Sequence, residues 1–308
     1  MFFHRHRLSV FPPFIAVLLI CLEAPAQTAP ATQSAAIHFK AVVGKEDFAC
    51  GRSYSGIGTT KSTIQPKDFR LYIHNVRLLD ETGKEVPLQL DQDGTWQLDD
   101  LALIDFEDAR GACGNGTPEI NTVAVGVVPS EHQYHGLKFT VGVPFEKNHT
   151  DLTKMPSPLN LTSMAWVWNA GRKFIRIEFA STGRPRGNVL HLGSTGCTPN
   201  TTKTTVPTSC VNPNRPEISL PDFDPAKDQV VLDLAALLQD SDVDNTPKEF
   251  ASGCMSSVNN PDCEPLFSNL GLALKGGDPH AQTVFRSKPA DLTAALPLGT
   301  SRQEASKP

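Results

Sequence analysis

The sequence predicts a mostly-β protein, a β-sandwich with long loops held together by disulfides. Three observations indicate this class. Short segments of alternating apolar residues recur along the chain, glycine (22 residues) and proline (25 residues) are frequent, and six cysteines follow an amino-terminal leader. The 308 residues are enough to bury a substantial core.

The amino terminus resembles a signal peptide. A cationic start, MFFHRHR, precedes the apolar run FPPFIAVLLICL, and the small residues Ala24 and Ala26 stand at positions −3 and −1 of a cleavage site. The apolar run is too short to span a bilayer. We therefore expect a periplasmic or secreted protein. Its expected parts are a signal peptide (1–26), a flexible N-terminus (27–36), a single β-rich metal-binding domain (37–285) and a flexible tail (286–308).

Two other classes are disfavoured at this point. A lipoprotein anchored at Cys21 is the alternative to a cleaved leader, but Ile20 is bulky where that motif needs a small residue. The formal net charge is −5, and no stripe of basic residues occurs. A nucleic acid is therefore not the expected partner.

The first half of the domain contains the clearest strand. Residues 37–43 alternate as an opening strand, and residues 69–79 give the strongest strand signal of the chain. Because side chains alternate between the two faces of a strand, Tyr72 and His74 share one face. The aliphatic side chains Leu71 and Ile73 occupy the other.

Later segments are predicted with different clarity. Residues 96–106 fit a strand or a helix, whereas residues 121–129 and 137–144 are expected to pair with each other around a turn at 134–136. Residues 163–179 are predicted as a hairpin. Residues 229–238 begin as a strand and end as a short helix.

The hairpin carries two of the three tryptophans. Trp166 and Trp168 are two residues apart, so in a strand both indoles would project from one face. The turn Asn169-Ala170-Gly171 follows them. Buried core anchors are the ordinary role of such a pair.

The six remaining cysteines are expected to form three disulfides, because thiols pair in an oxidising compartment. Six cysteines allow 15 connectivities. Local loop closure favours Cys197–Cys210 and Cys254–Cys263, which leaves Cys50–Cys113 as the long-range link. We expect none of these cysteines to ligate a metal.

Three histidines are candidate metal ligands. His74 projects from the strongest strand, His149 ends a strand-to-loop segment, and His191 precedes a Gly- and Ser-rich loop. Imidazole is a common ligand of copper, and a rigid β-sandwich can hold two or three such rings. Taken singly, each ring is more often structural. A hydrolase is disfavoured because no nucleophile-elbow, zinc-protease or P-loop motif occurs.

Six segments in order resemble one family. They are FRLYIHNVRLLDETG, WQLDDLALIDFED, GTPEINTVAVGVVP, YHGLKFTVGVPFEKNH, MAWVWNAGRKFIRI and HLGSTGC. Together they resemble the secreted four-cysteine proteins of the "metallo-mystery pair" type, which are related to the copper-binding protein encoded beside methanobactin genes. The resemblance covers roughly residues 37–285.

The resemblance implies copper as cofactor and a dihaem cytochrome c peroxidase-like protein as partner. In that family the partner oxidises a tryptophan to kynurenine, and related proteins bind Cu(I) through two histidines and this kynurenine. Tyr72 stands two residues before His74, where the family has the modified tryptophan, so Trp166 or Trp168 is the expected target and Tyr72 a neighbour of the site. Arg172 stands where an aromatic residue is expected.

The sequence therefore predicts a non-catalytic Cu(I)-binding protein. His74 and His149 are the principal ligands, with His191 in reserve. The alternative is a metal-free secreted β-sandwich binding module, whose histidines and tryptophans line a core or a ligand face.

Overall fold

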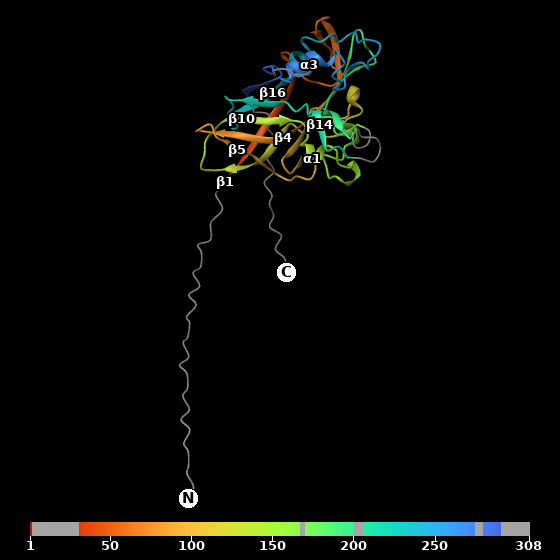
Figure 1. The fold of residues 1–308 in the computed structure, drawn as a ribbon. Helices are drawn as coiled ribbons and strands as arrows, with labels where there is room; N and C mark the ends of the chain where they lie inside the picture. The colour runs from red at the N-terminus through yellow and green to blue at the C-terminus, as the bar shows by residue number, and fades with distance from the viewer. Residues whose placement is uncertain (2–30, 167–169, 200–205, 275–279, 291–308) are drawn as a thin grey trace. The chain divides into compact units, whose positions relative to one another are not determined.

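The structure is a computed structural model that describes residues 1, 31–166, 170–199, 206–274 and 280–290 (Figure 1). The chain divides into two units, Met1–Pro30 and Ala31–Pro308. The expected signal peptide lies outside the described residues except for Met1. None of the helices in the described ranges is long and apolar enough to cross a membrane.

The second unit is mostly β and is built on two large sheets. The first sheet has the order β18-β16-β1-β9-β6, with β2 paired to β1. Its strands are β1 (Thr32–Val43), β2 (Glu46–Asp47), β6 (Gln89–Leu90), β9 (Val123–Pro129), β16 (Asp228–Asp233) and β18 (Phe285–Pro289).

The second sheet has ten strands, one of which is the long strand β4. Its order is β15-β10-β4-β11-β12-β17. Strands β3, β5 and β8 also pair with β4, and β7 pairs with β8. The strands are β3 (Tyr54–Ile57), β4 (Ser62–Asp80), β5 (Glu85–Pro87), β7 (Gln97–Leu98), β8 (Leu101–Asp105), β10 (Tyr134–Val141), β11 (Ile175–Ser181), β12 (Asn188–Leu192), β15 (Glu217–Leu220) and β17 (Gly253–Cys254).

Smaller elements complete the fold. Strands β13 (Thr195–Thr198) and β14 (Ser209–Asn212) form a separate two-stranded ribbon. The helices are α1 (Phe145–Asn148), α2 (Leu234–Leu238) and α3 (Cys263–Asn269), with 3-10 turns η1 (Gly111–Cys113), η2 (Leu152–Lys154) and η3 (Thr162–Met164).

Aromatic contacts join the two large sheets. The ring of Phe139 on β10 lies 5.8 Å from that of Phe39 on β1 and 5.7 Å from that of Phe285 on β18. Edge-to-face packing at these distances is the favourable geometry for aromatic pairs. Leu71 and Ile73 of β4 are fully buried within the same core cluster. The predicted mostly-β sandwich is confirmed.

The ends of the domain are more ordered than we predicted. Residues 32–36 belong to β1 and pair with β9, so this part of the expected flexible N-terminus is a strand. Residues 286–289 belong to β18 and pair with β16, so the expected tail does not begin at 286. In both cases the partner strand satisfies backbone groups of a polar-looking segment.

Three further expectations can be compared with the structure. The predicted pairing of residues 121–129 with 137–144 is wrong, because β9 pairs with β1 and β6, whereas β10 pairs with β4 and β15. Residues 96–106 form the strand pair β7–β8, which resolves the ambiguity. The prediction of a strand followed by a helix is confirmed by β16 and α2.

The predicted hairpin at residues 163–179 is only partly formed. Its second strand is β11, with Ile175, Ile177 and Phe179 buried. In place of the first strand the chain has η3 and a single bridge between Ala165 and Arg172. Trp168 lies outside the described residues.

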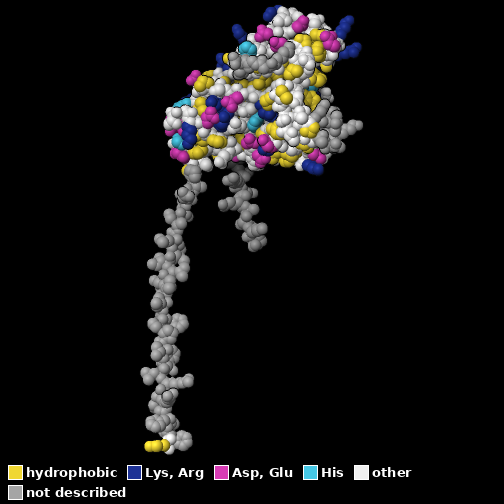
Figure 2. Space-filling model, in the orientation of Figure 1, with side chains coloured by type: hydrophobic (Ala, Val, Ile, Leu, Met, Phe, Trp, Pro, Cys, Tyr) yellow, Lys and Arg dark blue, Asp and Glu magenta, His cyan; other side chains and the backbone are white. Residues whose placement is uncertain are grey.

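The disulfide connectivity is as predicted. The bonded pairs are Cys50–Cys113, Cys197–Cys210 and Cys254–Cys263. On the surface, Figure 2 shows basic and acidic side chains mixed over β5 and β10. There Arg77 pairs with Glu85 and Glu217, and Lys138 also pairs with Glu85. No stripe of one sign results.

Candidate metal centre

One face of β4 is covered by a loop-rich segment. The side chains of Asp68, Arg70, Tyr72 and His74 alternate along β4 with those of Phe69, Leu71 and Ile73 and therefore share one face of the strand. The described residues of 142–174, which we call the covering segment, lie over this face. The site is built from these two parts of the chain.

Three hydrogen bonds made by side chains of β4 attach the covering segment to this strand. Arg70 Nη1 donates to Ser163 Oγ at 3.1 Å, and the Tyr72 hydroxyl donates to the Pro158 carbonyl at 2.7 Å. His74 Nδ1 lies 2.9 Å from the Gly142 carbonyl oxygen. Tyr72 is therefore a buried anchor of the covering segment. Burial raises the pKa of its hydroxyl above the usual value.

The hydrogen bond of His74 fixes its tautomer. A carbonyl oxygen can only accept, so His74 Nδ1 carries the proton and Nε2 keeps a free lone pair. The side chain is buried, with 9% exposed, and this burial lowers the pKa of the imidazole. His74 is therefore neutral at pH 7 and able to bind a metal through Nε2.

A two-step relay fixes His149, but here the ring accepts the hydrogen bond. His149 caps the C-terminus of α1 and is only 2% exposed. The backbone N–H of Arg172 donates to Asn148 Oδ1 at 2.8 Å, so the amide of Asn148 must present its Nδ2 on the other side. Asn148 Nδ2 donates to His149 Nε2 at 3.0 Å. His149 Nε2 is therefore the unprotonated nitrogen.

Arg172 organises this part of the covering segment, and sequence reasoning did not assign it this role. Its side chain is 1% exposed, and its guanidinium donates to the carbonyls of Lys147, Asn148, Thr150 and Leu159 at 2.7–3.3 Å. The signal available in the sequence was an arginine directly after a glycine turn, at a position where an aromatic side chain was expected.

The Cys197–Cys210 disulfide lies beside His149. His149 Nε2 is 3.5 Å from Cys210 Sγ and 3.9 Å from Cys197 Sγ. Figure 1 shows β14 next to α1, in agreement with these contacts. Among the described residues this is the one place where three or more His, Cys, Asp or Glu side chains could meet at a metal. The sulfurs are bonded to each other and are not thiolates in this state.

The chain at Trp166 and Gly171, which we call the tryptophan turn, also packs against this region. Gly171 has a φ of +103°, and a Cβ at this position would lie 3.1 Å from His149 Cε1. The half-buried Trp166 donates its backbone N–H to the Gly171 carbonyl at 3.0 Å. Its ring lies over Gly193, where a Cβ would approach ring atom Cζ3 to 2.2 Å. Trp166 thus has close packing partners.

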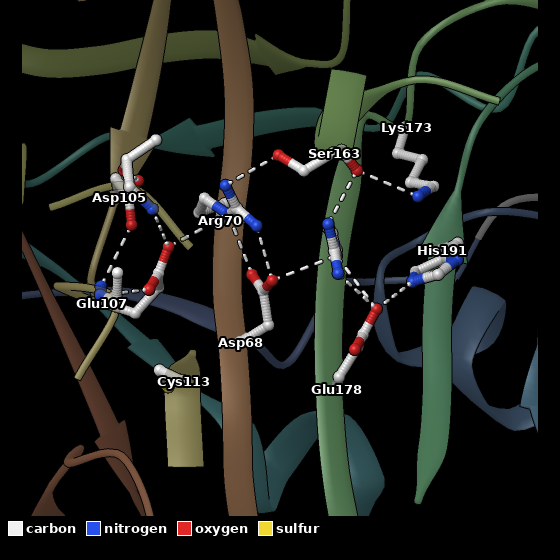
Figure 3. Close-up of polar contacts among 12 residues, drawn as sticks. Asp68, Arg70, Asp105, Glu107, Cys113, Ser163, Lys173, Glu178 and His191 are labelled. Carbon is white, nitrogen blue, oxygen red and sulfur yellow. Dashed lines mark hydrogen bonds and ion pairs between the residues drawn. The ribbon is translucent and has the colours of Figure 1, made fainter. Parts of the chain in front are cut away.

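His191 belongs to a different group of side chains, shown in Figure 3. His191 Nε2 lies 3.0 Å from Glu178 Oε1. Burial lowers the pKa of His191. Burial also opposes ionisation of Glu178, but His191 and Arg176 outweigh it and lower the pKa of that carboxyl to about 2. His191 is thus a partner of a charged carboxylate.

The same network extends across the sheet to β8. Arg70 donates to both carboxylate oxygens of Asp68 at 2.9 and 2.6 Å and lies 3.4 Å from Glu107 Oε1 (Figure 3). Arg176 lies 3.0 Å from Asp68 Oδ2. Burial raises the pKa of Asp105 to about 7. We call this group the charged face: Asp68, Arg70, Asp105, Glu107, Arg176, Glu178 and His191.

The structure therefore separates the predicted site residues. His74 contacts the first residue of the stretch 142–149, and His149 is its last residue, beside the tryptophan turn. His191 lies in the charged face instead. The fold and these contacts define a disulfide-linked, mostly-β protein with two buried histidines, His74 beside the covering segment and His149 within it.

Comparison with known proteins gives the family. The family model MbnP matches residues 32–256. Among solved structures, MbnP from Methylosinus trichosporium is similar with a TM-score of 0.74 and 33% sequence identity, covering 84% of this chain and 99% of that one. No curated protein matches the chain. The chain belongs to the MbnP family.

Proposed function

We propose that this MbnP-family protein is a non-catalytic copper-binding protein of the periplasm or the secreted fraction. His74 and His149 are its principal ligands, with His191 in reserve. His149 Nε2 accepts from Asn148 Nδ2, and a metal bound there would replace this hydrogen bond. The observation that carries this proposal is the fixed tautomer of His74, whose Nδ1 donates to the Gly142 carbonyl and whose Nε2 is left without a proton. A histidine held this way by its surroundings is typical of metal ligands.

The donor set fits Cu(I). Neutral imidazoles bind copper without loss of a proton, and Cu(I) accepts low coordination numbers with such ligands. A third ligand would come from the tryptophan turn, which packs against His149 through Gly171. In this proposal a dihaem cytochrome c peroxidase-like partner oxidises Trp166 or Trp168 to kynurenine.

Copper analysis of the variants tests the histidines. Protein purified from a periplasm should lose most of its copper in His74→Ala and in His149→Ala. His135→Ala is the matched control, because His135 lies on the same sheet and is exposed. Undiminished copper in both principal variants would overturn the ligand assignment, whereas wild-type protein without copper would favour a metal-free binding module.

Mass spectrometry tests the tryptophan separately. Coexpression with the dihaem partner should add about 4 Da to a peptide spanning residues 164–172, as expected for tryptophan converted to kynurenine. The same peptide from cells without the partner is the control. An unmodified peptide in the presence of an active partner would remove the kynurenine and leave the histidines as the proposed ligands.

A further inference from the structure

Arg215, in the connection between β14 and β15, holds a positive charge against both ends of the covering segment. Its Nε donates to the Val143 carbonyl at 2.7 Å, and its guanidinium carbon lies 4.9 Å from the ring centroid of the buried Phe174. Within the part of the chain that the structure describes, Arg215 Nη2 is buried and has no hydrogen-bond partner. The guanidinium is therefore fixed in place by packing, and it stays protonated at pH 7.

Arg215 and His74 are attached to consecutive residues of one bend. His74 Nδ1 donates to the Gly142 carbonyl at 2.9 Å, and Arg215 Nε donates to the carbonyl of the next residue. Gly142 has a φ of +130°, and a Cβ at this position would lie 3.2 Å from Arg215 Cγ. The missing side chain thus lets the arginine lie directly beside the residue that orients the imidazole.

The charges around His74 leave Arg215 unbalanced. Burial is the main cause that lowers the pKa of His74, and the positive charges of Arg215 and Lys147 lower it further, whereas Asp100 raises it. Lys147 and Asp100 form an ion pair at 3.3 Å, and both side chains are partly exposed. Their fields oppose each other and are screened by water. The positive field that remains at the imidazole is therefore that of Arg215.

We propose that Arg215 makes the copper site at His74 selective for Cu(I) over Cu(II), an inference that rests on the proposed function. A fixed positive charge repels a divalent ion twice as strongly as a monovalent ion at the same place. Since the guanidinium is packed in protein, water and salt screen it less than they screen a surface cation. Arg215 has no acceptor atom and cannot ligate the metal, so it acts only through its field.

Removing the charge while keeping the hydrogen bond tests this role. Glutamine Nε2 takes the place of arginine Nε, so Arg215→Gln retains a donor for the Val143 carbonyl. Two unit charges roughly 10 Å apart near a protein surface repel by an amount that corresponds to about 10-fold in an equilibrium constant. The variant should therefore bind Cu(I) about 10-fold and Cu(II) about 100-fold more tightly than wild type. The reduction potential of the bound copper should fall by about 59 mV.

Competition with coloured chelators for each oxidation state measures the two affinities, and voltammetry measures the potential. Arg215→Lys restores the charge and should keep the ratio of the two affinities within about threefold of the wild-type ratio. Arg52→Gln is the matched control. Arg52 also lies over an aromatic ring, 5.4 Å from the centroid of Tyr54, but it is half exposed and pairs with Glu46. Its removal should change the ratio less than about twofold.

An unchanged ratio of affinities in Arg215→Gln would overturn the inference. So would the same altered ratio in Arg215→Gln and Arg215→Lys, because that result would follow from lost packing and not from lost charge.

Failure of the proposed function has a different signature. If His74→Ala keeps its copper, both the site at His74 and the selectivity role of Arg215 are overturned. If His74→Ala loses its copper while Arg215→Gln leaves the ratio unchanged, the copper site stands and only the role of Arg215 is overturned.

Discussion

The charged face lies under the covering segment and His149 belongs to that segment, yet the two regions satisfy their polar groups differently. In the charged face, each buried arginine meets carboxylates, as Arg70 does with Asp68 and Glu107. Around His149, the buried Arg172 donates to backbone carbonyls, and the imidazole is neutral. One region pairs its charges, and the other satisfies its polar groups with carbonyl and amide partners.

This difference separates structural from functional polarity. A buried ion pair with its hydrogen bonds made has no remaining capacity to bind a ligand, and its removal damages the fold. A histidine nitrogen that accepts a hydrogen bond has no proton, and a metal can bind it in place of the donor. The charged face should therefore govern stability, whereas the His149 region should govern binding.

The largest effect is expected from breaking the charged face. Arg70→Met leaves the carboxylates of Asp68 and Glu107 buried without their partner and should lower the free energy of unfolding by about 3–5 kcal/mol. Arg77→Met is the control on the same strand, since its ion pairs are partly exposed and should contribute less than about 1 kcal/mol. Denaturant unfolding measures both, and equal effects would contradict the distinction.

The next effect concerns pH. The folded-state pKa of Asp105, raised to about 7 by burial, exceeds its unfolded value, so the folded protein binds more protons between about pH 4 and 7. The stability linked to Asp105 is thus fully present below about pH 4 and is lost as the pH rises through 7. The side chain of the Asp105→Asn variant cannot ionise. As the pH rises from 4 to 7, the free energy of unfolding of the wild type should therefore fall by about 2–3 kcal/mol relative to that of the variant.

Unfolding curves at several pH values measure this difference. Asp100→Asn is the control, because Asp100 lies on the surface near Lys147. A constant gap between wild type and Asp105→Asn from pH 4 to 7 would show that Asp105 does not titrate in this window.

A smaller effect should distinguish binding from stability in the His149 region. Asn148→Asp keeps the acceptor for the Arg172 N–H but removes the donor to His149, so His149 Nε2 must take up the proton. Copper affinity should fall about 10-fold, as for other residues that orient a metal ligand. Asn269→Asp is a control at a buried asparagine that contacts the Leu237 carbonyl. Competition with a coloured Cu(I) chelator measures both.

The smallest effect on copper binding is expected from a change beside His191, the reserve ligand in the charged face. Glu178→Gln removes the charge that raises the pKa of His191, so that pKa should fall further in a nuclear magnetic resonance titration. Copper affinity should change less than about twofold, because His191 is a reserve ligand. A large loss of copper affinity would instead show that His191 is a principal ligand.

Local patterns sufficed for much of the fold. The alternation in residues 69–79 predicted the central strand, and short loops predicted the Cys197–Cys210 and Cys254–Cys263 disulfides. Sheet membership was not predictable in the same way. Residues 121–129 and 137–144 are close in sequence, but burial of both apolar faces sends them to different sheets.

The site required three-dimensional information. His74 and His149 were named from their sequence context, but their tautomers depend on Gly142 and on the Asn148–Arg172 contact. The role of Arg172 depends on four carbonyls of a segment more than 10 residues upstream. No periodicity or spacing carries such information, because it arises from the packing of a loop on a sheet.

Strand β18 has a practical consequence for making fragments of this protein. The family model ends at residue 256, whereas β18 covers the outer edge of β16 and α3 supplies Cys263 as the partner of Cys254. A fragment that stops at the family boundary would expose the apolar edge of β16 as a template for aggregation and leave Cys254 with an unpaired thiol. Expression of the folded unit therefore needs the chain through Pro289.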